Sequence, residues 1–345
     1  MAKYFRVSLP FTCKKSSPKI IPFFLPFSGC KKRCLFCDQD VVTGFVQPSL
    51  NLKSRWLEIL KAKKSKAPYE LAFYGGTFTN LPEKAFTECL EFTKSLISEG
   101  LILKARCSTR PDALDSERLR ALKQAGFTTI ELGIQSFKEE ALKTCLRGYL
   151  RDKAMTGCQK VKAYGFKLGV QLLAGMPETT PLDFLADVEI SLLQQADFLR
   201  FYPCLVFKHT GLALLWEQGG FKPWDLDLTL ETLAKGLVLA LKKKVPVIRM
   251  GLAPNLDFSQ VLAGPWAADL GSQVQAYALY KLIQEQKEQN IQASLVKVYL
   301  PNNFQGFYLG HKRALALRYA SIGLSLDKFK FGKFLGPWLL FKSYS

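Results

Sequence analysis

Short apolar runs alternate with amphipathic stretches along residues 20–205 of this chain. The apolar runs are rich in Phe, Leu, Val and Ile and end at turn-forming residues, which predicts strands. The longer stretches repeat apolar residues at three- and four-residue spacing, which predicts helices. The predicted strands are 20–27, 70–75, 101–109, 128–135, 167–175 and 198–205, and the predicted helices are 52–64, 82–97, 114–125, 154–164 and 181–195.

Each predicted strand except the last is followed by a helix, which indicates a parallel sheet with right-handed crossovers. The runs Leu71-Ala-Phe-Tyr and Val170-Gln-Leu-Leu-Ala are typical of strands that are covered on both faces. A barrel and an open, doubly wound sheet share this pattern, so periodicity does not choose between them. Both architectures bind ligands at the carboxyl ends of their strands. Functional residues are therefore expected at those ends.

The alternation changes after residue 205. The pattern there predicts helices over 228–243 and 273–289, a strand over 245–252, and further β structure over 293–300. We therefore expect two units in an α/β protein. The first is a core over residues 1–215, and the second is a smaller α+β extension over residues 216–345 that packs on the core.

The composition is that of a globular protein, with 48% hydrophobic and 22% charged residues. No apolar stretch reaches the 18 or so residues that a membrane span needs. The N-terminus lacks the long apolar segment of a signal peptide. These features predict a cytoplasmic protein with no membrane partner.

The net charge of +19 is concentrated at the two ends of the chain. Residues 1–66 hold 14 Lys and Arg against 3 Asp and Glu, and residues 297–345 hold 8 against 1. The residues between them are nearly neutral, with 26 basic against 25 acidic side chains. Basic charge confined to two ends indicates a surface that meets phosphate, which makes a nucleic acid a candidate partner.

Three cysteines, Cys30, Cys34 and Cys37, share one short segment with the spacing C-x3-C-x2-C. A structural zinc site needs four protein ligands, whereas this segment offers three and the only histidines, His209 and His311, are far away in sequence. A disulfide framework is not expected, because nine cysteines without a secretory signal indicate a reducing compartment. Three thiolates suit a cubane iron–sulfur cluster in which one iron is open to a small molecule.

Glycines and polar residues recur where the predicted strands end. A Gly-Gly pair lets the backbone approach a ligand closely, and a Gln within an apolar strand needs a hydrogen-bond partner when it is buried. A plain turn or a structural hydrogen bond would explain each motif by itself, but their shared location favours one ligand cavity. The residues concerned are Gly75, Gly76, Thr77, Ser108, Gln135 and Gln171.

The cysteine spacing, with the aromatic Phe36 directly before the last cysteine, resembles the signature of the radical S-adenosylmethionine (SAM) enzymes. The resemblance implies that the three cysteines hold a [4Fe-4S] cluster whose open iron chelates the amino and carboxylate groups of SAM. It also implies reductive cleavage of SAM to a 5′-deoxyadenosyl radical, with Phe36 against the adenine. An electron donor such as a flavodoxin or ferredoxin would then be a partner.

Four further motifs resemble those of radical SAM proteins of the bacterial Elongator-like group and, more distantly, of the oxygen-independent coproporphyrinogen oxidases. They lie at residues 73–79, 108–112, 133–137 and 146–149. In this family Gly75, Gly76 and Thr77 would bind the SAM amino group, and Gln135 belongs to the fourth-strand motif. Ser108 stands where Glu is common, and Tyr149 stands where His is usual in the Arg-Gly-His motif. The resemblance implies that Arg147 and Gln171 approach SAM. It also implies a partial (β/α)6 barrel.

Taken together, the resemblance and the charge pattern predict a radical SAM enzyme whose substrate is a tRNA base. Phosphate contacts are expected from the basic ends, at Lys31, Lys32, Arg33, Lys312 and Arg313. We expect no acetyltransferase domain, because 345 residues leave no room for one beside this core, so the Elongator reaction itself is not assumed. Two alternatives stay open: a radical enzyme that acts on a porphyrin or another small molecule, and a non-catalytic iron–sulfur protein that binds nucleic acid.

Overall fold

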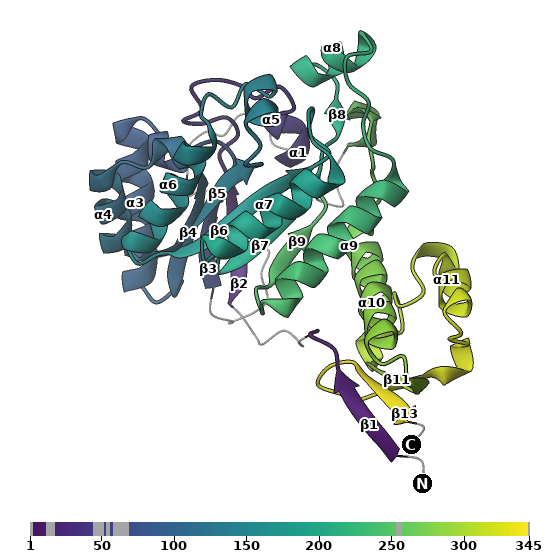
Figure 1. Cartoon of the computed structure of the whole chain (residues 1–345). Helices are drawn as coiled ribbons and strands as arrows, with labels where there is room; N and C mark the ends of the chain where they lie inside the picture. Colours follow the sequence, from purple (N-terminus) through teal and green to yellow (C-terminus); the bar gives the residue numbers. More distant parts are fainter. Residues whose placement is uncertain are drawn as a thin grey trace.

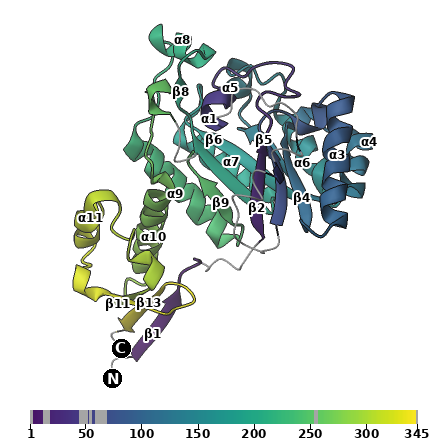
Figure 2. The same cartoon turned by 180° about the vertical axis from the view of Figure 1, so that it is seen from behind.

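A parallel sheet of seven strands, in the order β2-β3-β4-β5-β6-β7-β9, forms the centre of the molecule. The computed structural model describes residues 3–11, 18–43, 52, 56–57, 69–252 and 257–343. The sheet curls into a half-barrel with helices on its outer side (Figures 1 and 2). Its strands are β2 (Lys19–Phe24), β3 (Tyr69–Tyr74), β4 (Lys104–Thr109), β5 (Phe127–Gln135), β6 (Lys167–Ala174), β7 (Phe198–Pro203) and β9 (Val247–Met250).

Burial on both faces explains why these strands are largely apolar. Leu71, Phe73, Ile130 and Val170 are all fully buried, as parallel strands beneath covering helices should be. The rings of Phe73 and Phe78 pack with their centroids 4.7 Å apart. The parallel α/β core predicted from periodicity is confirmed, and the seventh strand comes from the predicted strand 245–252.

Three of the covering helices, α4, α7 and α9, begin at a side-chain cap. Asp115 accepts hydrogen bonds from the backbone amides of the first turn of α4, and Thr180 forms a capping box with Asp183 at the start of α7. The predicted helix 52–64 lies largely outside the described residues, and the short helix α5 was not predicted. The helices are α3 (Glu83–Ser98), α4 (Ser116–Gln124), α5 (Glu139–Thr144), α6 (Arg151–Ala163), α7 (Pro181–Leu193) and α9 (Leu226–Lys242).

Short elements follow the strands at the carboxyl end of the sheet, which is the upper end in Figure 1. Helix α1 (Gln39–Thr43) follows the cysteine segment, and α8 (Gly211–Glu217) follows β7. Between them lies a two-stranded antiparallel pair, β8 (Val206–Phe207) with β10 (Val261–Ala263). None of these short elements was predicted, because each is too short to show a period.

A second sheet, in the order β1-β13-β11-β12, lies at the lower end of the molecule in Figure 1. Strand β1 pairs antiparallel with β13 through all six residues of each strand, so both ends of the chain enter one sheet. Its strands are β1 (Lys3–Ser8), β11 (Ala293–Pro301), β12 (Phe329–Gly332) and β13 (Trp338–Ser343), and its helices are α10 (Leu270–Gln289) and α11 (Ala316–Ser321).

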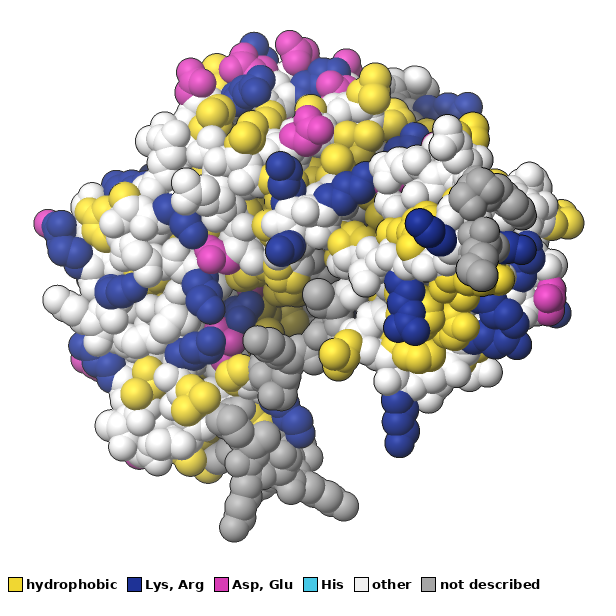
Figure 3. Space-filling view, turned by 60° about the horizontal axis from the view of Figure 1, so that its bottom comes forward, with side chains coloured by type: hydrophobic (Ala, Val, Ile, Leu, Met, Phe, Trp, Pro, Cys, Tyr) yellow, Lys and Arg dark blue, Asp and Glu magenta, His cyan; other side chains and the backbone are white. Residues whose placement is uncertain are grey.

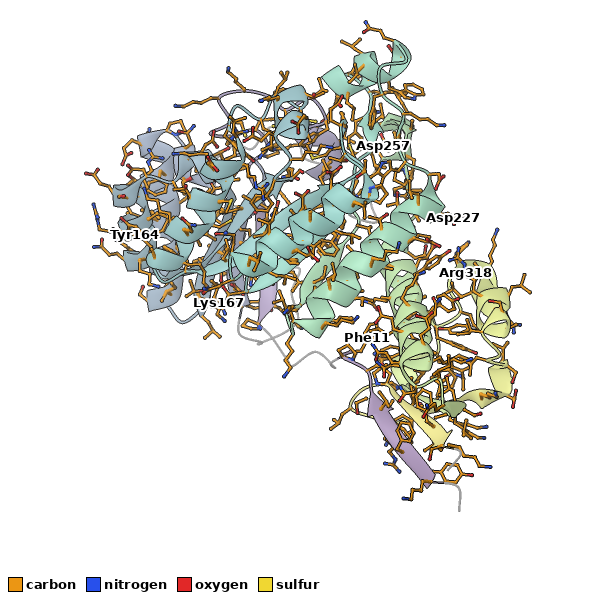
Figure 4. The ribbon with its side chains drawn as sticks, viewed as in Figure 1. Phe11, Tyr164, Lys167, Asp227, Asp257 and Arg318 are labelled. Carbon is orange, nitrogen blue, oxygen red and sulfur yellow. The ribbon has the colours of Figure 1, made fainter. Side chains whose placement is uncertain are left out.

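Packing and ion pairs join this C-terminal unit to the core. Arg318 of α11 donates to Glu231 of α9 at 2.5 Å, and Lys242 of α9 pairs with Glu285 of α10 at 2.7 Å. Within the C-terminal unit, the ring of Phe11 meets that of Phe304 edge to face at 5.4 Å. Arg318 and Phe11 are labelled in Figure 4. Among the described helices, none combines the length and the apolar character needed to cross a bilayer.

Candidate functional site

A cavity of about 600 Å³ opens at the carboxyl ends of the parallel strands. Residues from β3 through β9 and from the cysteine segment line it together. The predicted site residue Thr77 does not line the cavity and is buried, with 1% of its surface exposed. The predicted site residues that line the cavity are Cys30, Cys34, Phe36, Cys37, Gly75, Gly76, Ser108, Gln135, Arg147 and Gln171.

The cysteine segment is fastened to the turn that follows β3. The backbone amide of Thr77 donates to the carbonyl of Ser28 at 2.8 Å, and the Asn80 amide group donates to the carbonyl of Gly29 at 2.6 Å. Gly76 has a φ of +57°, and a Cβ there would lie 2.1 Å from the carbonyl oxygen of Ser28. The glycine is therefore required for this close approach.

Burial keeps two of the three thiols protonated. The pKa of Cys30 is raised by burial, which outweighs its 3.2 Å hydrogen bond to Thr77. The pKa of Cys37 is raised to about 12, first by burial and then by the charge of Cys34. Such thiols become thiolates when a bound cation replaces the proton. Neither thiol is therefore activated as a free nucleophile.

Two guanidinium groups lie against the third thiol. Arg147 Nη1 is 3.0 Å from Cys34 Sγ, and Arg110 Nη1 is 3.7 Å from the same sulfur. These cations offset the negative charge that thiolate ligands bring into the cavity. They also place two oxyanion-binding groups directly beside the cysteines.

The three cysteines suit a cubane cluster. Among the described residues, no three His, Cys, Asp or Glu side chains converge as ligands of one ion would. In a cubane cluster each cysteine binds a different iron, so three sulfurs spread around one cavity are suitable. Cys30, Cys34 and Cys37 have this arrangement.

The glycine turn is supported by a residue that sequence reasoning missed. Gln39 accepts a hydrogen bond from the amide of Gly76 at 2.7 Å and another from the amide of Phe27 at 2.5 Å. One side chain thus links the cysteine segment to the turn after β3. The only signal in the sequence was its position two residues after the last cysteine.

Arg147 is held in place by Tyr149. Only 5% of the surface of Arg147 is exposed. Its guanidinium donates to the Tyr149 hydroxyl at 2.7 Å and to the carbonyl of Gly133. The Tyr149 hydroxyl lies 3.0 Å from the carbonyl of Ile134, as donor. Tyr149 therefore orients Arg147 toward the cysteines.

A buried carboxylate organises the floor of the cavity. Glu131 is fully buried, and it accepts hydrogen bonds from Arg200 at 2.6 Å, Arg106 at 3.2 Å and Tyr74 at 3.1 Å. Burial by itself favours the neutral acid, but the charges and hydrogen bonds of Arg200 and Arg106 outweigh it and lower the pKa of Glu131. The carboxylate is therefore ionised and fixes the positions of the two arginines.

The two glutamines predicted to face one cavity do line it. Gln171 donates to Ser108 at 3.2 Å and to Glu131 at 3.1 Å, which supplies the partners that a buried Gln needs. Gln135 has a φ of +71°, an unusual backbone for a residue other than glycine, and it follows a shift in the pairing of β5 with β6. Whether these residues contact SAM stays a prediction.

Further lining residues come from β7 and β9 and were not predicted. Arg200, Tyr202 and Arg249 face the cavity, and the buried Nε of Arg200 has no hydrogen-bond partner within the described chain. A charged residue inside the apolar run 198–203 was the available signal, of the same kind as Gln171. Of the predicted phosphate contacts, Lys32 and Arg33 line the mouth of the cavity.

Residues 24–189 match the family model described as the Radical SAM superfamily, and residues 196–278 match the model described as the Radical_SAM C-terminal domain. The tRNA uridine(34) acetyltransferase of Methanocaldococcus infernus is 27% identical over 208 residues, which cover 54% of this chain and 39% of that protein. The heme chaperone HemW of Synechocystis is 26% identical over 57% of this chain and 49% of its own length. The chain thus spans less than half the length of these relatives.

The fold has a solved counterpart in the archaeal Methanocaldococcus infernus Elp3 with an N-terminal deletion. The two align with a TM-score of 0.60 and 21% identity, over 78% of this chain and 64% of the other. At this identity the likeness shows the fold. The two family models, over residues 24–189 and 196–278, show that this chain belongs to the radical SAM superfamily.

Proposed function

We propose that this protein uses Cys30, Cys34 and Cys37 to hold a [4Fe-4S] cluster and cleaves SAM reductively. The observation that carries the proposal is that the three cysteines and seven of the predicted SAM contacts line a single cavity at the carboxyl ends of the strands. When bound, the cluster would supply one electron to the SAM sulfonium, giving methionine and a 5′-deoxyadenosyl radical. A flavodoxin or ferredoxin is the kind of donor that this chemistry needs.

The residues around the cysteines have roles that follow from their chemistry. Arg147 is a fixed guanidinium beside Cys34 and suits the SAM carboxylate, because guanidinium binds carboxylate through paired hydrogen bonds. Phe36 offers an aromatic face to the adenine. Gln171 and Ser108 present polar groups to the ribose. The cavity walls would limit the access of bulk water to the radical, as radical cofactor chemistry requires.

We further propose that the substrate is an RNA, with a tRNA base as the reacting group. Two relatives are named tRNA uridine(34) acetyltransferase. The basic side chains of both chain ends support a phosphate-bearing partner. Lys31, Lys32 and Arg33 are exposed beside the cavity mouth, where they suit the phosphates of a substrate.

The test is anaerobic formation of 5′-deoxyadenosine from SAM by reconstituted and reduced protein. Cys34→Ala should abolish the product and lower the iron content. Cys158→Ala, at a buried cysteine in α6, is the matched control and should retain both. Added tRNA should increase product formation if RNA is the substrate. A complete cluster that forms no deoxyadenosine would contradict the proposal and favour a non-catalytic iron–sulfur protein.

A further inference from the structure

The four-stranded sheet of the C-terminal unit has one covered face and one open face. On the covered face, Leu339 and Phe341 of β13 and Val298 of β11 are fully buried. The ring of Phe329 in β12 lies edge-on to Tyr319 of α11 at 5.0 Å. Because side chains alternate along a strand, the intervening residues of these strands form the opposite face.

The register of the strands places those intervening residues in three rows. In the first row Ser8, Trp338, Tyr299 and Lys330 stand side by side. The second row holds Arg6, Leu340 and Lys297, and the third holds Tyr4, Lys342 and Ser294. None of the three aromatic residues in these rows is buried, and 59% of Tyr4 is exposed.

The aromatic side chains of this open face are arranged as a platform. The rings of Tyr299 and Trp338 stack with centroids 3.7 Å apart and planes 7° from parallel. Phe334 meets both rings edge-on, at 5.8 and 6.0 Å. The Arg6 guanidinium lies 4.5 Å from the centre of the Trp338 ring. Flat rings fixed by their neighbours lose little entropy when a further ring stacks on them.

The charge of this sheet has one sign. Its four strands contain five Lys and Arg residues and no Asp or Glu: Lys3, Arg6, Lys297, Lys330 and Lys342. In Figure 3, which brings this end of the molecule forward, Lys and Arg side chains flank a group of hydrophobic ones on the lobe at right. A surface for an apolar protein partner would not need this uniformly positive charge.

We propose that the open face of the β1-β13-β11-β12 sheet binds a single-stranded segment of RNA. Unpaired bases stack on aromatic side chains, and phosphates pair with neighbouring Lys and Arg, in proteins that bind single strands on a sheet or groove. Tyr299 and Tyr4 supply stacking surfaces, and Trp338 supplies a third once the Arg6 guanidinium that lies over its ring turns to a phosphate. Lys297 and Lys330 supply the other cations. Three rows suit roughly two or three bases.

This inference rests on the RNA part of the proposed function and gives it a location. It unites the two basic ends of the sequence, since β1 belongs to one and β13 to the other. The sheet lies at the opposite end of the molecule from the cysteine segment (Figure 1). The platform therefore anchors an RNA large enough to reach the cavity as well, such as a folded tRNA.

Binding of a fluorescent single-stranded RNA 12-mer to the full-length reconstituted protein, without SAM or reductant, tests the platform. Trp338→Ala should weaken binding roughly 5- to 150-fold through the loss of one stacking position, and Trp338→Tyr should restore most of it. Lys330→Gln should lower the slope of log affinity against log salt by about 0.7. Lys94→Gln, at an exposed lysine of α3, should leave both unchanged.

Two controls make the outcome decisive. The same RNA annealed to its complement should be insensitive to Trp338→Ala, because paired bases are not free to stack. If a folded Trp338→Ala protein binds the single-stranded RNA with unchanged affinity, the proposal is wrong. The open face would then be better explained as a binding site for a protein partner or a second copy of this chain. Because RNA binding is measured without SAM, its result does not depend on whether the protein forms deoxyadenosine. Equally, a failure of RNA binding would not affect the deoxyadenosine assay.

Discussion

Replacing Glu131 should strongly lower the free energy of unfolding, because Glu131 is the common partner of two largely buried arginines, Arg106 and Arg200. It is fully buried and pairs with Arg200 at 2.6 Å and Arg106 at 3.2 Å. Glu131→Gln keeps the shape but removes the charge. Arg106 would keep Glu70, at 2.7 Å, whereas Arg200 would lose its only carboxylate among the described ion pairs. Removing one partner of a buried ion pair lowers the free energy of unfolding by about 3–5 kcal/mol.

A double-mutant cycle separates this loss of pairing from a general defect in packing. Arg200→Met by itself removes the cation, and the double variant Glu131→Gln with Arg200→Met removes both charges. Urea unfolding followed by circular dichroism should show the double variant more stable than Glu131→Gln alone, because an unpaired buried guanidinium costs more than an absent pair. If Glu131→Gln costs less than about 1 kcal/mol, or if the second substitution adds a further loss, this account of the cavity floor is wrong.

Three further predictions concern other parts of the core. Burial raises the pKa of Asp187 to about 7, above its unfolded value of about 4. The folded protein thus binds this proton more tightly, and the stability it contributes is lost as the pH rises toward 7. Asp187→Asn should flatten this dependence in urea unfolding at several pH values. Gly76→Ala should lower the iron content after reconstitution, because its Cβ would lie 2.1 Å from the Ser28 carbonyl; a fully loaded variant would contradict this. Tyr149→Phe should raise the KM for SAM with little change in iron content, since it frees Arg147, and unchanged kinetics would refute that role.

The parallel core could be predicted from the sequence because its signals are local. Strands such as β3 and β6 are apolar on both faces, and the helices between them begin at recognisable caps such as Asp115 and Thr180. The cysteine segment and the Gly75-Gly76 turn were equally visible, because spacing and glycine each constrain a few consecutive residues. Short elements such as α5 and β8 were not predicted, since they span too few residues to show a helical or strand periodicity.

The polar floor of the cavity could not be predicted, because strand register decides which side chains meet. Glu131 pairs across the sheet with Ser108 on one side and with Gly169 on the other. A Cβ on Gly169 would lie 3.0 Å from Glu131 Cγ, so the glycine leaves room for the carboxylate. In the sequence, each of these residues is a single departure from the pattern of a largely apolar strand. Only the alignment of four strands brings Arg106, Glu131, Gln171 and Arg200 together.

The same limit applies to the charge pattern, with a consequence for function. The two basic ends predicted a phosphate-binding surface, but they are separated by about 230 nearly neutral residues, and no local signal pairs β1 with β13. Antiparallel pairing of the first and last described strands places Arg6 of one basic end and Lys342 of the other on the same sheet face. Since Lys32 and Arg33 line the cavity mouth instead, the basic charge is divided between two sites at opposite ends of the molecule. A substrate that meets both must be long, which favours a folded RNA over a porphyrin.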